Sequence, residues 1–166
     1  MRLNLIVAFD QNYNIGYKNS IPWHFSEDLK HFKKITTNNI CIMGKNTWDS
    51  LPLKPLLNRT NIVISSTYFN NKKLKNIPNV LVFNEFGNCL NFCLNYFENK
   101  EIFVIGGRDL YQEVLNYYTL KRMIVTHIKH EYEGDVKFPH VNWNVWKVNK
   151  VLNTNKDFDI IEYVRK

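Results

Sequence analysis

The sequence has no long hydrophobic run and little cysteine. No apolar stretch approaches the ~20 residues that a membrane-spanning helix needs, and the apolar stretch after Met1 meets Asp10 before it reaches the length of a secretory signal. We therefore expect a first β-strand there and a cytoplasmic protein. The three cysteines, Cys41, Cys89 and Cys93, lack the number and spacing of a zinc site, so we expect reduced, buried thiols and no metal.

Repeats, linkers and low-complexity tracts are also lacking. With 45% hydrophobic and 22% charged residues, the composition excludes disorder and suits a single domain over residues 1–166. The net charge is +7. Such a charge suits either a nucleic acid or a small anionic ligand. Because the lysines are dispersed without a long basic block, composition leaves both open.

Short apolar runs alternate with helical patterns, which predicts an α/β domain with a largely parallel sheet. The expected strands are Leu3–Phe9, Asn39–Met43, Asn61–Ser65, Val80–Phe83, Glu101–Ile105 and Met123–Ile128. The expected helices are Ser26–Ile35, Lys45–Leu51, Cys89–Glu98 and Asp109–Asn116. A polar turn between Val145–Leu152 and Phe158–Val164 predicts an antiparallel C-terminal hairpin. The turn-rich stretch Thr67–Pro78 predicts a surface loop.

Three of the predicted strands end in residues suited to holding an anion, at the sheet edge where open α/β folds bind ligands. The segment Gly44-Lys45-Asn46-Thr47 brings a lysine to the free N–H groups of a helix start. Ser65 and Ser66 follow a second strand, and Gly106 and Gly107 follow a third, where a ligand can lie against the backbone. Each junction also has an ordinary explanation as a turn, and the dinucleotide-binding pattern GxGxxG is absent.

Asp28 is the most informative single residue. We expect Ser26 to cap a helix, which puts Glu27 and Asp28 in its first turn. Asp28 then shares a helix face with Phe25 and Phe32, whereas Glu27 points to water. Acids in a first turn often serve only the helix dipole. A carboxylate among apolar side chains, however, is partly desolvated and needs a donor from a ligand or water.

Taken together, the motifs resemble the dihydrofolate reductase family over nearly the whole chain, in order and in spacing. They comprise Ile15-Gly16, Asn19 to Trp23, Asp28-Leu29 with Phe32-Lys33, Ile42 to Trp48, Arg59, Ile64-Ser65-Ser66, Val104 to Gly107, Tyr111, Thr126-His127-Ile128, Glu133-Gly134-Asp135 and Phe138-Pro139. The resemblance implies an eight-stranded mixed, mostly parallel sheet flanked by four helices. It implies NADPH-dependent reduction of 7,8-dihydrofolate to 5,6,7,8-tetrahydrofolate for one-carbon metabolism. A hydride would pass from nicotinamide C4 to pterin C6, and a solvent proton would reach N5.

The resemblance assigns Asp28 to the pterin, whose N3 and 2-amino group match a carboxylate as guanidinium does. Thr126 would be linked to Asp28 through a water, and Trp23 would position a water beside the ring. Arg59 would bind the glutamate α-carboxylate with its fork of donors, with weaker attraction from Lys33 and Lys54. Further substrate contacts are implied for Ile6, Val7, Leu29, Phe32, Leu51, Leu56 and Ile105, of which Leu51 would serve equally well as core.

For the cofactor, the resemblance implies a mobile loop, Tyr13–Ile21, over the site, and a cis peptide bond between Gly106 and Gly107. Lys45 and Ser66 would favour NADPH over NADH. The family often has a third glycine and then a basic residue after that pair, where this chain has Arg108 and Asp109. The implied cofactor contacts are Ala8, Ile15, Gly16, Asn19, Ser20, Ile21, Gly44, Lys45, Asn46, Thr47, Ser65, Ser66, Ile105, Gly106, Gly107, Arg108, Asp109, Leu110 and Tyr111.

The expected partners are the small-molecule substrate and antifolate inhibitors, without nucleic acid or membrane, and the chain is expected to be a monomer. Two alternatives remain open. A reductase of the same fold, acting on a pyrimidine intermediate of riboflavin synthesis, would keep the NADPH junctions but need not have Asp28 with Arg59. A basic nucleic-acid-binding module would explain the charge, yet it leaves Asp28 and the double glycine without a role.

Overall fold

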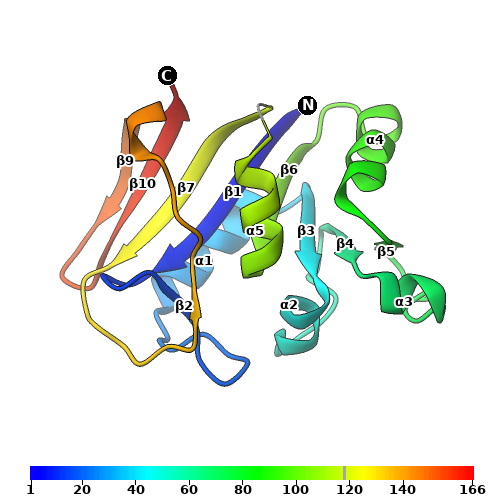
Figure 1. Cartoon of the computed structure of the whole chain (residues 1–166), viewed down its shortest axis with the longest axis horizontal. Coiled ribbons are helices and arrows are strands. Elements are labelled where there is room, and N and C mark those ends of the chain that lie inside the picture. Colours follow the sequence, from blue (N-terminus) through cyan, green and yellow to red (C-terminus); the bar gives the residue numbers. More distant parts are fainter. Residues whose placement is uncertain (118) are drawn as a thin grey trace.

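The protein is built around an eight-stranded sheet with helices on both faces (Figure 1). A computed structural model describes residues 1–117 and 119–166. The strands of this sheet are β1 (Arg2–Phe9), β3 (Ile40–Gly44), β4 (Thr60–Ile64), β5 (Val80–Phe83), β6 (Glu101–Gly106), β7 (Leu120–Ile128), β9 (Trp146–Thr154) and β10 (Phe158–Arg165). A second, two-stranded sheet pairs β2 (Asn14–Gly16) with β8 (Val136–Lys137). The helices are α1 (Ser26–Thr36), α2 (Lys45–Ser50), α3 (Ser66–Asn70), α4 (Phe86–Tyr96), α5 (Arg108–Leu115) and a 3₁₀ turn, η1 (Trp143–Val145).

The strand order of the main sheet is β5-β4-β3-β6-β1-β7-β10-β9. Every pair from β5 to β7 is parallel, whereas β10 is antiparallel to both β7 and β9. The sheet is therefore mixed, with its antiparallel part at the C-terminus, as the sequence predicts.

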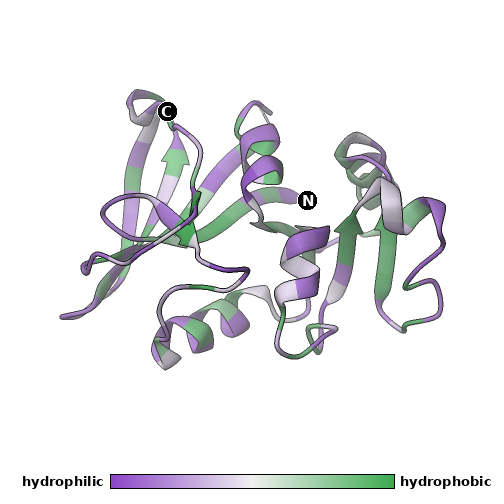
Figure 2. Cartoon of the chain, turned by 60° about the horizontal axis from the view of Figure 1, so that its bottom comes forward, coloured by the Kyte–Doolittle hydropathy of each residue, from purple (hydrophilic) through white to green (hydrophobic). Residues whose placement is uncertain are grey.

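The central strands are apolar on both faces because helices cover both sides of the sheet. Ile40, Cys41, Ile42 and Met43 of β3 are all fully buried. Figure 2 shows the same division, with hydrophobic colour concentrated on the strands and hydrophilic colour on the loops and outer helix faces. Cys89 and Cys93 are buried free thiols, as is Cys41, in agreement with the expectation.

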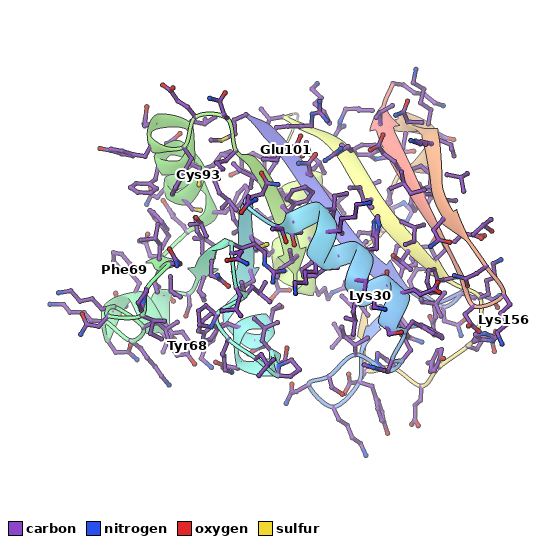
Figure 3. The ribbon with its side chains drawn as sticks, turned by 180° about the vertical axis from the view of Figure 1, so that it is seen from behind. Lys30, Tyr68, Phe69, Cys93, Glu101 and Lys156 are labelled. Atoms are coloured by element: carbon purple, nitrogen blue, oxygen red, sulfur yellow. The ribbon has the colours of Figure 1, made fainter. Side chains whose placement is uncertain are left out.

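Helix α1 crosses one face of the sheet over β1 and β6 (Figure 3). Glu27 and Asp28 lie in its first turn and Lys33 and Lys34 in its last, an order that suits the helix dipole. The predicted cap was wrong: Phe25 precedes the helix, Ser26 is its first residue, and no side chain caps this end.

Other differences from the expected elements are local. Within the predicted loop Thr67–Pro78 the structure has α3, because the Ser65 hydroxyl accepts a hydrogen bond from the Tyr68 N–H and starts a helical turn. The described chain thus has a fifth, short α-helix beyond the four expected. The small β2–β8 sheet was not predicted either, since its strands are too short to show a period. No described helix has the length and apolar character to cross a membrane.

Candidate active site

The parallel strands end at one edge of the sheet, at the bottom of Figure 1. Gly44 at the end of β3 is the register partner of Ile64 at the end of β4, which places Lys45 beside Ser65. Met43 pairs with Gly106 of β6, and Ala8 of β1 pairs with Thr126 of β7. The three junctions singled out from the sequence therefore lie along one edge, as the ligand-binding edge of an α/β sheet requires.

Asp28 and Thr126 meet where α1 begins over this edge. The Thr126 hydroxyl, on a side chain only 4% exposed, donates a 2.7 Å hydrogen bond to Asp28 Oδ1. The resemblance implied a water between the two residues; the structure has direct contact instead. Trp23 is buried beside Tyr132, with ring centroids 5.4 Å apart, and Ile6 of β1 belongs to the same apolar cluster.

The surroundings of Asp28 favour its neutral form. Burial raises the pKa of its carboxyl above the ordinary value, while the hydrogen bond from Thr126 and the charge of His31 oppose the shift. His31, on the same helix, has its pKa lowered by burial, against the pull of Asp28. Its Nε2 is buried and has no hydrogen-bond partner among the residues that the structure describes. Asp28 thus has a desolvated carboxylate and forms no ion pair within the described residues.

Arg59 lies at the other end of α1 and is only 8% exposed. Its Nε donates to the Leu57 carbonyl at 2.9 Å and its Nη1 to the Thr36 hydroxyl at 3.2 Å. The guanidinium also lies 5.9 Å from the centre of the Phe32 ring. Among the described residues it has no carboxylate partner, and burial lowers its pKa. Arg59 is therefore a buried cation with neutral partners.

A polar cavity of about 180 Å³ adjoins Arg59. It lies at the amino ends of β3, β4 and β6, on the opposite edge of the sheet from the strand–helix junctions. It is lined by Asn38, Asn39, Asn58, Arg59, Thr60, Asn79 and Lys100. Space beside a buried guanidinium is what an incoming anion needs.

Phe32 lies on α1 between Asp28 and the guanidinium of Arg59. Phe32 is half-buried one turn beyond Asp28, Leu51 and Leu56 are half-buried against the core around Trp48, and Leu29 is 46% exposed at the rim. Lys33 is exposed on α1. Lys54 is engaged elsewhere: its Nζ donates to the carbonyls of Trp48 and Asp49 at the end of α2.

Two glycines and two hydroxyls form a tight group where β6 meets α5. The Gly106–Gly107 peptide bond is cis, as the resemblance implied. Gly106 has φ +133°, and a Cβ built there would lie 3.2 Å from the Thr47 hydroxyl. The buried Tyr111 hydroxyl donates to the Ile6 carbonyl at 2.8 Å, and burial raises its pKa. Only glycine fits at position 106, because a side chain would be crowded by Thr47 and Tyr111 and strained at this φ.

Lys45 does not have a free ammonium. Its Nζ donates to Asp49 Oδ2 at 2.7 Å, and the Tyr68 hydroxyl donates to Asp49 Oδ1 at 2.6 Å. Burial would raise the pKa of Asp49, but these two hydrogen bonds lower it below its ordinary value. Ser65 is used as the cap of α3, while Asn46 and Ser66 are exposed.

The segment before α1 is held in place by hydrogen bonds to the buried carboxylate of Asp10. Asp10 is 2% exposed and accepts hydrogen bonds from the backbone N–H groups of Asn12, Asn14 and Tyr132 and from the Asn14 amide. These bonds lower its pKa although burial acts to raise it. Ile15 and Gly16 follow in β2. The Lys18 N–H then donates a 3.0 Å hydrogen bond to Asp135. The next residues, Asn19, Ser20 and Ile21, are exposed.

Arg108 and Asp109 are exposed at the start of α5, and Leu110 is buried behind them. Arg108 Nη1 donates to the Lys137 carbonyl at 2.6 Å, and a cavity of about 410 Å³ lies between Arg108 and residues 134–137. The first N–H groups of α5 have no partner within the helix. Together with Lys45 and Ser66, they fit a ligand that carries phosphates.

Sequence reasoning missed several residues of this edge. Asp49 could have been found, because it stands four residues after Lys45 in a predicted helix, the spacing of an ion pair. Tyr68 gave no such signal, since its partner Asp49 lies in another helix. Asp10 has local donors in Asn12 and Asn14, but its bond from Tyr132 depends on the fold. Val7 is buried, and Ala8 and Ile105 are half-buried, toward the ends of β1 and β6.

Comparison with known proteins gives concordant results. A sequence profile of the family described as "Dihydrofolate reductase" matches residues 2–164. The dihydrofolate reductase of Buchnera aphidicola subsp. Acyrthosiphon pisum is 36% identical over 173 residues, covering 97% of this chain and 99% of the relative. That of Bacillus subtilis is 36% identical over 155 residues, covering 93% and 86%. The solved structure of dihydrofolate reductase from Enterococcus faecalis, complexed with NADP(H) and RAB-propyl, has a TM-score of 0.85 and 27% identity, covering 99% of this chain and 96% of that one.

Proposed function

This chain belongs to the dihydrofolate reductase family, and we propose that it carries out the family's NADPH-dependent reduction of 7,8-dihydrofolate with Asp28, Thr126 and Arg59 as the residues that hold the substrate. The observation that carries the assignment of residues is the pair of desolvated charges at the two ends of α1, each without an ion-pair partner in the described chain.

The spacing of these charges supports an elongated substrate. Asp28 and Thr36, which contacts Arg59, are eight residues apart on α1, or about 12 Å along the helix axis. A ligand that reaches both must have N–H donors at one end, a carboxylate at the other and an apolar middle beside Phe32. Dihydrofolate has its pterin, p-aminobenzoyl group and glutamate in that order. A pyrimidine of riboflavin synthesis has no carboxylate for Arg59, and a nucleic acid has no use for a buried carboxylate.

Asp28 acts by binding and orienting the pterin. Thr126 occupies one site on Oδ1 and leaves the remaining acceptor sites of the carboxylate for two parallel N–H donors. Because the group is desolvated, its charge acts more strongly on the ring than it would in water. We infer that it raises the basicity of the bound pterin, so that a solvent proton reaches N5, while Trp23 positions the water beside the ring.

The cofactor is assigned to the strand–helix junctions. NADPH, when bound, supplies the hydride from its nicotinamide ring. Ala8, Ile15 and Gly16 would border that ring, and the Gly106–Gly107 backbone would let it approach β6. Lys45, Thr47, Ser66 and the first N–H groups of α5 would hold the phosphates.

The proposal also describes a monomer in the cytoplasm. Three buried free thiols suit a reducing compartment. Light scattering on the purified chain tests the oligomeric state. A dimer would contradict the proposed monomer but not the proposed activity.

The decisive experiment is the loss of NADPH absorbance with and without dihydrofolate, for the wild type and for Asp28→Asn. The amide keeps the shape of the carboxyl but not its charge, so turnover at pH 7 should fall by about 100-fold or more. It should recover in part as pH falls, because the pterin then arrives protonated. Glu27→Gln, an exposed acid in the same helical turn, is the matched control and should keep full activity. Near-wild-type turnover of Asp28→Asn at pH 7 would contradict the assignment.

A further inference from the structure

Two lysines from different segments lie at one aromatic ring beside the proposed phosphate site. Lys45 Nζ lies 5.0 Å from the centre of the Tyr68 ring, and Lys73 Nζ lies 4.9 Å from the same centre. Tyr68 is 5% exposed and belongs to α3, two residues after Ser66. Figure 3 labels it between α3 and α2. The fold therefore brings Lys73, from the stretch after α3, to the junction that already holds Lys45, Ser65 and Ser66.

The charges of this group do not cancel. Asp49 accepts hydrogen bonds from both Lys45 and the Tyr68 hydroxyl, so it compensates Lys45. Lys73 is exposed and forms no ion pair with any residue that the structure describes. Lys73 is thus the uncompensated cation of the group.

The geometry points to Lys73 as a second specificity-determining residue for the cofactor, which with Lys45 and Ser66 selects NADPH over NADH by attracting the adenosine 2′-phosphate. This inference rests on the proposed function for the position of the adenosine side. The two cofactors differ in that phosphate monoester alone, which carries roughly −1.5 to −2 charge at pH 7. A phosphate beside Tyr68 would lie within the ~8 Å screening length of both ammonium groups, and Lys73 would supply the charge that Asp49 withdraws from Lys45.

The test measures binding, without turnover. Equilibrium titrations give Kd for NADPH, NADH, adenosine 2′,5′-bisphosphate and 5′-AMP with the wild type, Lys73→Gln, Lys73→Glu and Lys75→Gln. Lys75 is an exposed lysine two residues further along and serves as the control. Lys73→Gln should weaken NADPH and the bisphosphate about three- to fivefold, as expected for an exposed ion pair. Lys73→Glu should weaken them more, NADH and 5′-AMP should be unaffected, and added salt should shrink the differences.

Asp49→Asn gives an effect of opposite sign. The amide can still accept from the Tyr68 hydroxyl but removes the negative charge, so NADPH should bind more tightly while NADH does not.

Three results would overturn the inference. Equal weakening of NADPH and NADH by Lys73→Gln would mean a structural role. No change in NADPH binding, in a wild type that prefers NADPH, would exclude Lys73 and leave the proposed function intact. A wild type that binds neither NADPH nor NADH would contradict both this inference and the proposed function.

Discussion

Replacing Arg59 by glutamine separates recognition of the substrate's tail from recognition of its ring. The guanidinium has five N–H donors, and the protein uses Nε for Leu57 and Nη1 for Thr36. Enough donors remain for a two-bond contact with a carboxylate. Each hydrogen bond to a charged group contributes about 1.5–3 kcal/mol. After the cost of desolvating the carboxylate, we expect a loss of about 3 kcal/mol, or roughly 100-fold in Kd.

The assay is a thermodynamic cycle over enzyme and substrate. The wild type and Arg59→Gln are each measured with dihydrofolate and with dihydropteroate, which has the same ring and benzoyl group but no glutamate. Arg59→Gln should raise Kd and KM for dihydrofolate by about two orders of magnitude and leave those for dihydropteroate nearly unchanged. The kcat at saturation should change little, because the ring still lies on Asp28.

The cycle also controls for folding. Arg59 is a buried charge with neutral partners, so Arg59→Gln removes the cost of burying a charge as well as two hydrogen bonds. The unfolding free energy should therefore change by less than it does when one partner of a buried ion pair is removed. Equal losses with both substrates would refute the reasoning, since they would show that Arg59 supports the site as a whole. No loss with either would place the glutamate elsewhere.

The remaining predictions concern the pterin and cofactor ends of the site. Thr126→Val removes the 2.7 Å hydrogen bond that opposes the raised pKa of Asp28, so the acid limb of the kcat/KM profile should move to higher pH; an unmoved limb would contradict the contact. Gly106→Ala places a Cβ 3.2 Å from the Thr47 hydroxyl at φ +133°, which should cost about 1–3 kcal/mol in thermal unfolding and weaken NADPH binding. Gly87→Ala, whose Cβ would meet only the Tyr117 hydroxyl at 3.9 Å, is its control and should do neither. Asp28→Asn should be more stable than the wild type at pH 7, although its turnover there is low, as unfolding titrations against pH would show.

The sign of that last effect follows from the raised pKa of Asp28. When the pKa in the folded state exceeds the ordinary 3.8, the folded state binds the proton more tightly than the unfolded state does. The stabilisation is complete below pH 3.8 and is lost as pH rises through the folded-state value. At neutral pH the wild type therefore carries the cost of a desolvated charge that asparagine lacks. If the wild type and Asp28→Asn had the same unfolding free energy at pH 7 as well as at low pH, Asp28 would have to be solvated.

The sequence predicted the elements whose signals are local. The expected strand Val80–Phe83 matches β5, and the other expected strands and helices overlap observed ones with ends that differ by a few residues. Such segments are recognisable because burial on both faces leaves a run of apolar residues. Helix α3 was missed because its formation depends on the Ser65 cap and on Tyr68 reaching Asp49, a contact with another helix.

At the site, the sequence identified candidate residues, but it did not give their burial or their hydrogen-bond partners. The position of Asp28 on an apolar helix face followed from the helical period, and the structure confirms partial burial. The direct hydrogen bond from Thr126, 98 positions away, and the burial of Arg59 depend on how α1 lies across the sheet. Lys45 and Ser66 were expected to favour NADPH; the pairing of Lys45 with Asp49 and the approach of Lys73 to Tyr68, which the sequence did not indicate, change the charge at that junction.

The two ends of α1 explain why binding and stability should be coupled in this protein. Removing a carboxylate and a guanidinium from water without pairing them is unfavourable, and at this separation neither can neutralise the other. A ligand with N–H donors at one end and a carboxylate at the other relieves both costs at once, whereas either half relieves only one. Dihydrofolate should therefore raise the melting temperature by more than the shifts from dihydropteroate and glutamate, each at the same concentration, taken together. Shifts that merely add would mean that the two charges do not share one ligand.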